Sequence, residues 1–203
     1  MKLYFMRHGQ TDYNERRLFQ GQIDIPLNET GRQQAEQTKK LIESMRVDFD
    51  RVIASPLGRA VETVRIVTGL DDPDIIREPR LKEMDFGILD GTRFDEPLPE
   101  AGTLFSDPES YIPPEGAESF QDMAERVGSF LDEIRGAGED ENILIGTHGG
   151  TIRCMLVCIG YMKLSEIWEY PIGNCSVYEV ELKDGKWQLN KVHATEDYFK
   201  GTK

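Results

Sequence analysis

The pattern of hydrophobic and polar positions predicts short buried strands that alternate with amphipathic helices. Apolar runs at 2–6 (KLYFM), 51–55 (RVIAS) and 143–147 (ILIGT) have the length and composition of parallel strands covered on both faces. Helical patterns predict helices over 27–45 with Thr30 as N-cap, over 57–67, over 119–135, and from Gly149 to residue 160. This alternation predicts an α/β fold: a three-layer sandwich whose mostly parallel central sheet carries helices on both faces.

Two segments depart from the alternation. Residues 174–182 and 186–193 alternate polar and apolar positions around Asp184-Gly185, which predicts a hairpin. The stretch Thr92–Glu118 contains five prolines, several acids and scattered aromatic residues, and a loop this long is typical of a lid or a substrate-specificity insertion. The length of 203 residues suits one domain over 1–203, with residues 92–118 as its lid-like insertion.

Composition and charge narrow the class of protein. Hydrophobic residues make up 38% and charged residues 30% of the chain, as in soluble globular proteins. The formal net charge of −13 argues against binding to nucleic acids or anionic membranes, which need clustered Lys and Arg. The apolar run that ends at Arg7 is too short for a signal peptide, and the stretch 154–162 is too short to cross a bilayer. We therefore expect a cytoplasmic protein.

The three cysteines give no sign of a disulfide framework or a metal site. Cys154 and Cys158 lie four residues apart in an apolar helix, Cys175 is remote, and no histidine lies close to them. We interpret the pair as core residues.

Basic and histidine side chains recur where predicted strands end. The first strand runs into Arg7-His8-Gly9, the second into Ser55-Pro56-Leu57-Gly58-Arg59, and the third into Thr147-His148-Gly149-Gly150. The carboxyl ends of parallel strands form one crevice, and the helices that follow point their N-termini into it. Two arginines, two histidines and helix N-termini that converge there form an anion pocket, for which a phosphoryl group is the natural occupant.

Each of these signals is weak when taken alone. A histidine at a strand end is usually a structural residue, and Arg59 by itself would be a surface or capping charge. His193 illustrates this interpretation, because it lies in the predicted hairpin and has no assigned role. The repeated placement at equivalent strand ends carries the prediction.

Six segments together resemble the histidine phosphatase superfamily, also called phosphoglycerate mutase-like, and specifically its phosphatase branch. The segments are R-H-G-Q-T-D-Y-N (7–14), L-F-Q-G (18–21), D-I-P-L-N-E-T-G-R-Q-Q-A (24–35), S-P-L-G-R-A (55–60), E-M-D-F-G (83–87) and T-H-G-G (147–150). Gln10 departs from the glutamate that many relatives carry, at a position outside the catalytic set.

The resemblance implies roles at the matching positions. His8 would accept the phosphoryl group, while Arg7, Arg59 and His148 would hold its oxygens. The remaining contacts to substrate and phosphate would come from Asn14, Gln20, Gly21, Thr147 and Gly149. Glu83 would give a proton to the leaving oxygen, although Asp85, two residues on, is a competing acid.

This chemistry suits the residue types. An attacking imidazole must be neutral, and nearby arginines disfavour its protonated form. Arginines and a histidine can clamp the equatorial oxygens of an in-line transfer without a metal. The prediction is a metal-independent phosphomonoesterase of the histidine acid phosphatase type, which needs no cofactor and hydrolyses small-molecule monoesters through a phosphohistidine.

Three other functions compete with this prediction. A cofactor-dependent phosphoglycerate mutase would use the same site and return the phosphate to a second hydroxyl. A non-catalytic binding module on this fold would be expected to lack an essential residue, and all are present. A zinc hydrolase is rejected because the three histidines lack a close pair.

The partner we expect is a small phosphorylated metabolite, with no nucleic acid and no membrane, and the oligomeric state stays open. The acids of residues 92–118 favour monoesters with neutral or cationic bodies.

Overall fold

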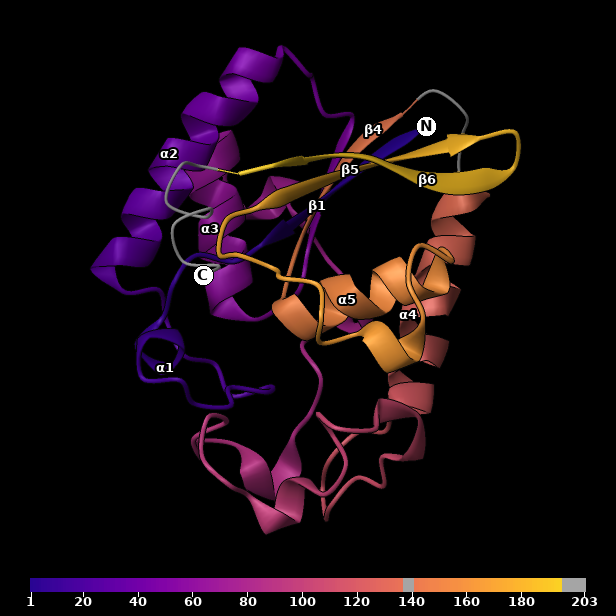
Figure 1. Ribbon diagram of the computed structural model, residues 1–203. Coiled ribbons are helices and arrows are strands. Elements are labelled where there is room, and N and C mark those ends of the chain that lie inside the picture. The colour runs from indigo at the N-terminus through magenta and orange to yellow at the C-terminus, as the bar shows by residue number, and fades with distance from the viewer. Residues whose placement is uncertain (137–140, 195–203) are drawn as a thin grey trace.

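A six-stranded sheet forms the centre of the molecule (Figure 1), which a computed structural model describes over residues 1–136 and 141–194. The strands are β1 (Lys2–Arg7), β2 (Arg51–Ala54), β3 (Ile76–Arg77), β4 (Asn142–Thr147), β5 (Val177–Lys183) and β6 (Lys186–His193). They lie in the order β3-β2-β4-β1-β5-β6. The first four are parallel, and β5 and β6 are antiparallel to their neighbours. The predicted mostly parallel sheet is confirmed.

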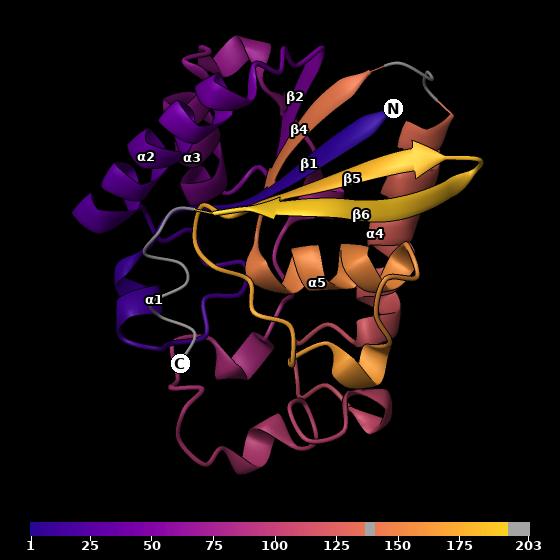
Figure 2. The same cartoon turned by 45° about the horizontal axis from the view of Figure 1, so that its top comes forward.

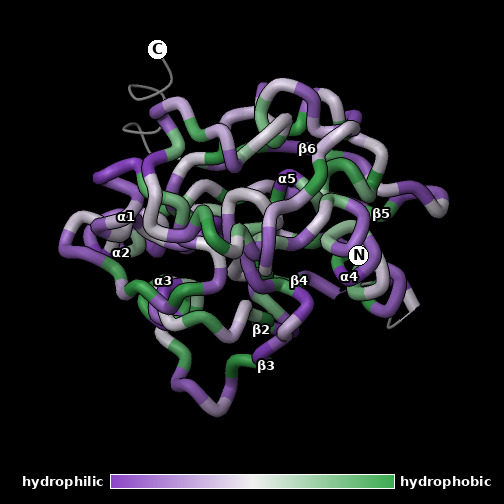
Figure 3. Tube along the Cα trace, turned by 90° about the horizontal axis from the view of Figure 1, so that it is seen from below, coloured by the Kyte–Doolittle hydropathy of each residue, from purple (hydrophilic) through white to green (hydrophobic). Residues whose placement is uncertain are grey.

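Helices cover both faces of this sheet. They are α1 (Asp12–Glu15), α2 (Glu29–Met45), α3 (Gly58–Thr68), α4 (Phe120–Arg135) and α5 (Gly149–Cys158). Figure 2 shows α2 and α3 on one side of the sheet and α4 and α5 on the other. Polar positions predominate in the outer segments around α1 and α2 (Figure 3). The structure thus has the three layers that the alternation predicts.

Period-two alternation along the strands builds a separate core on each face. In β1, Leu3 and Phe5 join the cluster that packs on α4 and α5, whereas Tyr4 and Met6 join the cluster on α2 and α3. All four side chains are almost completely buried. Because consecutive strand residues point to opposite faces, a strand with no polar position in its interior must be covered on both sides. This is why β1 lies in the interior of the sheet, between β4 and β5.

Local details differ from the sequence predictions at two residues, Thr30 and Cys158. The N-cap of α2 is Asn28, whose side chain accepts a hydrogen bond from the Gly31 N–H, so the Thr30 prediction is wrong. Cys158 is exposed and not in the core, whereas Cys154 and Cys175 are buried, and all three are free thiols. Strand β3 has two residues, too few for a periodic signal. The β5–β6 hairpin is confirmed, with Asp184 and Gly185 at positive φ in its turn.

Residues 92–118 lie at the end of the sheet where the parallel strands finish (Figure 1). The short 3₁₀ helices Pro99–Ala101 and Pro108–Ser110 lie within them, and four more span Asp72–Asp74, Pro79–Leu81, Gly87–Leu89 and Leu164–Glu166. Ala101 and Leu104 are buried in the α4–α5 core, so the segment is packed onto the domain. Its movement as a lid stays a prediction. No helix among the described residues is long and apolar enough to cross a membrane.

Candidate active site

A cavity of about 240 Å³ opens at the carboxyl ends of the parallel strands. Its lining includes most of the residues that the sequence places at the site: Arg7, His8, Asn14, Gln20, Gly21, Arg59, Glu83 and Gly149. The other lining residues are Leu18, Phe19, Phe86, Phe94, Phe105, Gly150, Arg153 and Trp168. Segments remote in sequence therefore converge on one cavity, as the strand-end argument predicts.

His8 follows β1 and is held in a defined tautomer. Its Nδ1 lies 2.7 Å from the Gly9 carbonyl oxygen, and a carbonyl can only accept a hydrogen bond. Nδ1 must therefore carry the proton, which leaves a lone pair on Nε2. The backbone is fixed as well, because the His8 N–H donates to Thr147 O and the His8 carbonyl accepts from Asn174 Nδ2. The ring thus presents one nucleophilic nitrogen.

Carbonyl groups hold the two predicted arginines in place. Arg59 donates from Nη1 to Ile23 O (2.7 Å) and from Nη2 to Gly21 O (2.8 Å). Arg7 donates from Nη1 to Ile172 O. The Nε atoms of both arginines are buried and have no hydrogen-bond partner within the described ranges. Two fixed cations thus keep an unused donor each, and an unpaired buried donor is costly unless a ligand satisfies it.

His148 lies against His8 but does not itself line the cavity. The ring centroids are 5.2 Å apart, and His148 Nε2 lies 2.7 Å from Ser55 Oγ. Its Nδ1 is buried and lacks a partner among the described residues, so the site holds a third unused nitrogen. The structure does not bring Thr147 to the cavity, because this residue is buried and its hydroxyl donates to Leu81 O. Thr147 supports the segment that leads to Glu83.

Glu83 is seated on the N-terminus of α5. Its carboxylate accepts from Gly150 N at 3.1 Å, from Thr151 N at 3.1 Å and from Met84 N at 2.9 Å. A Cβ on Gly150 would lie 2.6 Å from Glu83 Oε1, so any other residue at this position would displace the Glu83 carboxylate. Asp85, the competing acid, lies outside the cavity lining, and its Oδ1 accepts from Gly87 N.

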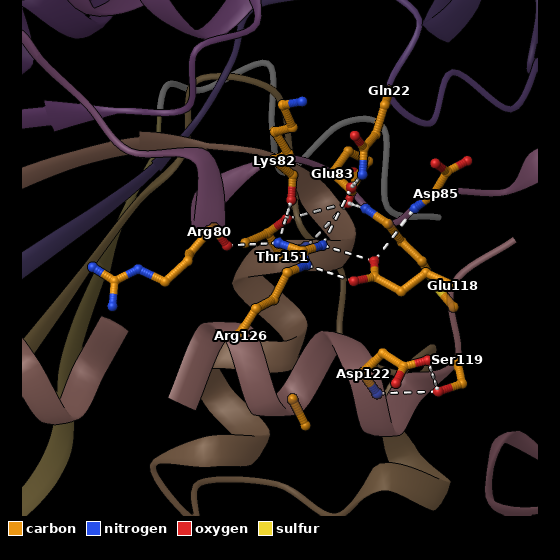
Figure 4. Close-up of polar contacts among 12 residues, drawn as sticks. Gln22, Arg80, Lys82, Glu83, Asp85, Glu118, Ser119, Asp122, Arg126 and Thr151 are labelled. Atoms are coloured by element: carbon orange, nitrogen blue, oxygen red, sulfur yellow. Dashed lines mark hydrogen bonds and ion pairs between the residues drawn. The ribbon is translucent and has the colours of Figure 1, made fainter. Parts of the chain in front are cut away.

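Arg126 holds the backbone that carries Glu83 (Figure 4). Its guanidinium forms a two-pronged ion pair with Glu118, at 2.6 and 2.8 Å. The same group donates to the carbonyls of Arg80 (2.6 Å), Lys82 (2.9 Å) and Glu83 (3.3 Å). Five donors in one rigid plane can tie a carboxylate and three carbonyls together, which a lysine cannot do.

The expectation that helix N-termini supply open donors is corrected for three N–H groups of α3 and α5. The Gly58 N–H of α3 donates to Asp24 Oδ1 at 2.7 Å, and the Gly150 and Thr151 N–H groups of α5 donate to Glu83. Carboxylates of the chain itself thus satisfy these three N–H groups, because anions are stabilised at helix N-termini whatever their source.

Comparison with known proteins agrees with this geometry. The family model described as histidine phosphatase superfamily (branch 1) matches residues 3–195. This chain belongs to the histidine phosphatase superfamily.

The relatives of this chain include one protein named as a mutase and one named as a phosphatase. The chain is 31% identical over 191 residues to a probable phosphoglycerate mutase of Enterobacter sp. (strain 638), covering 92% of this chain and 87% of that protein. It is 29% identical to a putative phosphoserine phosphatase 2 of Hydrogenobacter thermophilus, covering 93% of each.

Solved structures share the fold. YhfR of Bacillus stearothermophilus is 32% identical with a TM-score of 0.83, covering 93% of this chain and 94% of that one. Phosphoserine phosphatase of Entamoeba histolytica, a mutant in complex with phosphoserine, has a TM-score of 0.85 at 24% identity and covers 96% and 98%.

Burial sets the charge state of the histidines in this superfamily member. Burial lowers the pKa of His8 well below 6.5, and Arg59 and Arg7 lower it further against the opposing effect of the Gly9 carbonyl. Burial, with Arg59 next in size, also lowers the pKa of His148 well below that value. The pKa of Arg59 falls to about 10, mainly through burial, so this residue stays charged at neutral pH. The site thus combines neutral imidazoles with cationic guanidinium groups.

Sequence reasoning missed several residues of the site. Arg153 lies four residues after Gly149 on α5, so helical spacing places both on one face and could have revealed it. Phe19, Phe86 and Trp168 line the cavity from loops, and no local spacing predicts that.

Proposed function

We propose that this chain is a phosphomonoesterase of the histidine acid phosphatase type that works through a phosphorylated His8. One observation carries the proposal: His8, whose Nε2 is free to attack, lines the same cavity as Arg7 and Arg59, each of which has a buried Nε without a partner. The His148 ring, with an unpartnered Nδ1, lies 5.2 Å from the His8 ring. A phosphoryl group satisfies both needs, since it accepts several hydrogen bonds and has an electrophilic centre. The proteins named as phosphatases among the relatives and solved structures support it.

The reaction follows in two transfers. His8 Nε2 attacks phosphorus while Arg7, Arg59 and His148 hold the oxygens, and the P–O ester bond breaks. Glu83, in its acid form, gives a proton to the leaving alkoxide. Water then attacks phospho-His8, Glu83 takes a proton from that water, and the P–N bond breaks to release phosphate. Both transfers use side chains of the protein itself. Within residues 1–136 and 141–194, no cluster of three or more His, Cys, Asp or Glu side chains is arranged to hold a metal ion.

A phosphoglycerate mutase is the second candidate, favoured by the relative at 31% identity. The two differ in whether water or a second hydroxyl receives the phosphate. The protein is incubated with a panel of phosphomonoesters, with and without EDTA. For each ester that is hydrolysed, we expect the rate of phosphate release to be the same with EDTA as without it. If phosphate only moved between the hydroxyls of phosphoglycerate, the mutase would replace the phosphatase. Loss of activity in EDTA would overturn the metal-independent mechanism.

The lowered pKa of His8 predicts a nucleophile that stays neutral in acid. A depressed imidazole pKa means that the neutral form persists as pH falls and is lost only well below 6.5. We expect ¹⁵N signals of histidine-labelled protein to show His8 as the Nδ1–H tautomer at pH 6.5, with the His8→Gln variant assigning the resonance. A titration midpoint at or above 6.5 would contradict the prediction.

A further inference from the structure

One wall of the cavity is built from aromatic rings. We define this aromatic wall as Phe19, Phe86, Phe94, Phe105 and Trp168, all of which line the cavity. Phe19 lies at its centre, with centroids 4.7 Å from Phe86, 5.9 Å from Phe94 and 5.9 Å from Phe105. Phe105 is nearly parallel to Phe19, at 23°, and its centroid lies 5.2 Å from that of Trp168. The rings form one continuous apolar surface beside the phosphoryl pocket.

Two rings of the aromatic wall keep much of their surface in water. Phe94 is 42% and Phe105 is 43% exposed, whereas Phe19 and Phe86 are buried. Both exposed rings come from residues 92–118, and both face the cavity that holds His8. Apolar surface left in water at a concave site is covered favourably by an apolar ligand, and a flat ring can stack there or meet the wall edge to face.

The charged side chains that line the cavity do not require the substrate to carry a second anionic group besides its phosphate. Three arginines line it, Arg7, Arg59 and Arg153, and Glu83 is the one carboxylate in the lining over the described residues. Arg7 and Arg59 match the two negative charges of a phosphomonoester dianion. Arg153 is also engaged elsewhere, because its Nε donates to Tyr170 O and its guanidinium lies 5.3 Å over the Trp168 ring.

The acids of residues 92–118, from which the sequence suggested neutral or cationic substrate bodies, do not line the cavity in the described part of the chain. From this segment, the described lining contains Phe94 and Phe105 and no carboxylate. Asp95 is paired with Arg17 and Arg93, and Glu96 with Arg93. A neutral substrate body remains the expectation, for a different reason. The wall is apolar, the phosphate matches the charges of Arg7 and Arg59, and Arg153 is held by the Tyr170 carbonyl and the Trp168 ring.

We propose that the substrates are phosphomonoesters of alcohols that carry a flat, uncharged aromatic group, which packs on the aromatic wall. This inference rests on the proposed phosphatase function of the same site. It separates this chain from enzymes for small hydroxy-acid phosphates, whose carboxylate would lie against an apolar surface without gain.

The test compares primary alkyl esters, so that differences in leaving-group chemistry stay small. We expect kcat/KM for 2-phenylethyl phosphate to exceed that for ethyl phosphate, phosphoserine and 3-phosphoglycerate at least about tenfold, which burial of one ring-sized apolar group can supply. Phe105→Ala and Phe94→Ala are expected to reduce this preference severalfold. Ile112→Ala is the matched control, because Ile112 is an 84% exposed apolar residue of the same segment outside the cavity lining.

Each outcome bears on the inference. Equal or better turnover of phosphoserine or 3-phosphoglycerate would overturn it, and so would a preference that survives in both phenylalanine variants. If the wild type released phosphate from none of the esters, the proposed function would fail. Calorimetry with the His8→Ala variant would then still decide the inference, which requires tighter binding of 2-phenylethyl phosphate than of ethyl phosphate.

Discussion

Replacement of His8 by alanine is expected to reduce phosphate release by a factor of about 10³ or more, because the attacking nitrogen is lost. The neighbouring cations stay, since carbonyls at Gly21, Ile23 and Ile172 hold Arg59 and Arg7 independently of the imidazole. The variant should therefore still bind phosphomonoesters. The measurement is steady-state phosphate release together with intact mass after rapid alkaline quench, in which the wild type gains one phosphoryl group and the variant none.

His193→Ala is the matched control for this experiment. His193 is also buried, but it lies at the end of β6, where its Nε2 contacts Glu179 at 3.0 Å, and it does not line the cavity. Loss of this histidine should leave the rate unchanged. A phosphorylated His8→Ala variant, or one with near wild-type turnover, would show that His8 is not the acceptor.

Replacement of Glu83 by glutamine is expected to slow alkyl esters by a factor of about 10², and aryl phosphates far less. An alkoxide leaves poorly without a proton, whereas an aryl oxide leaves readily. The glutamine side chain is isosteric with glutamate, and its amide oxygen could still accept from the Gly150 or Thr151 N–H of α5. The measurement is kcat for a series of esters of increasing leaving-group pKa, whose slope should steepen in the variant.

Two further variants, Asp85→Asn and Arg126→Met, test whether Glu83 is the proton donor. Asp85 is the acid two residues on, outside the cavity lining, so its variant should keep the wild-type slope. Arg126 is a positioning residue, since it holds the carbonyls of residues 80, 82 and 83. Like Glu83→Gln, Arg126→Met should lower kcat for alkyl esters more than for aryl phosphates, by about tenfold. General destabilisation would slow both ester classes alike. If Glu83→Gln did so too, Glu83 would not be the proton donor.

Much of the fold follows from local patterns in the sequence. Apolar runs of strand length, amphipathic helices and the Asp184-Gly185 turn each depend on residues close together in the chain, and each is observed. The rule that parallel strands finish at one edge of a sheet then brings Arg7, His8 and Arg59 to one cavity without any knowledge of side-chain packing. Functional residues that directly follow parallel strands can therefore be predicted from the sequence to lie close together.

Contacts between remote segments were decided only by the tertiary structure. The aromatic wall brings together rings as far apart in the sequence as Phe19 and Trp168. Arg126, which pairs with Glu118, donates to carbonyl groups more than forty positions earlier in the chain. The same holds for three N–H groups at the N-termini of α3 and α5, which donate to Asp24 and Glu83. Such contacts depend on how whole elements pack, and packing leaves no periodic trace in the chain. The sequence by itself thus determined that the strand-end residues Arg7, His8 and Arg59 line one cavity. The tertiary structure alone decided how the proposed acid is seated and what kind of surface faces the rest of the substrate.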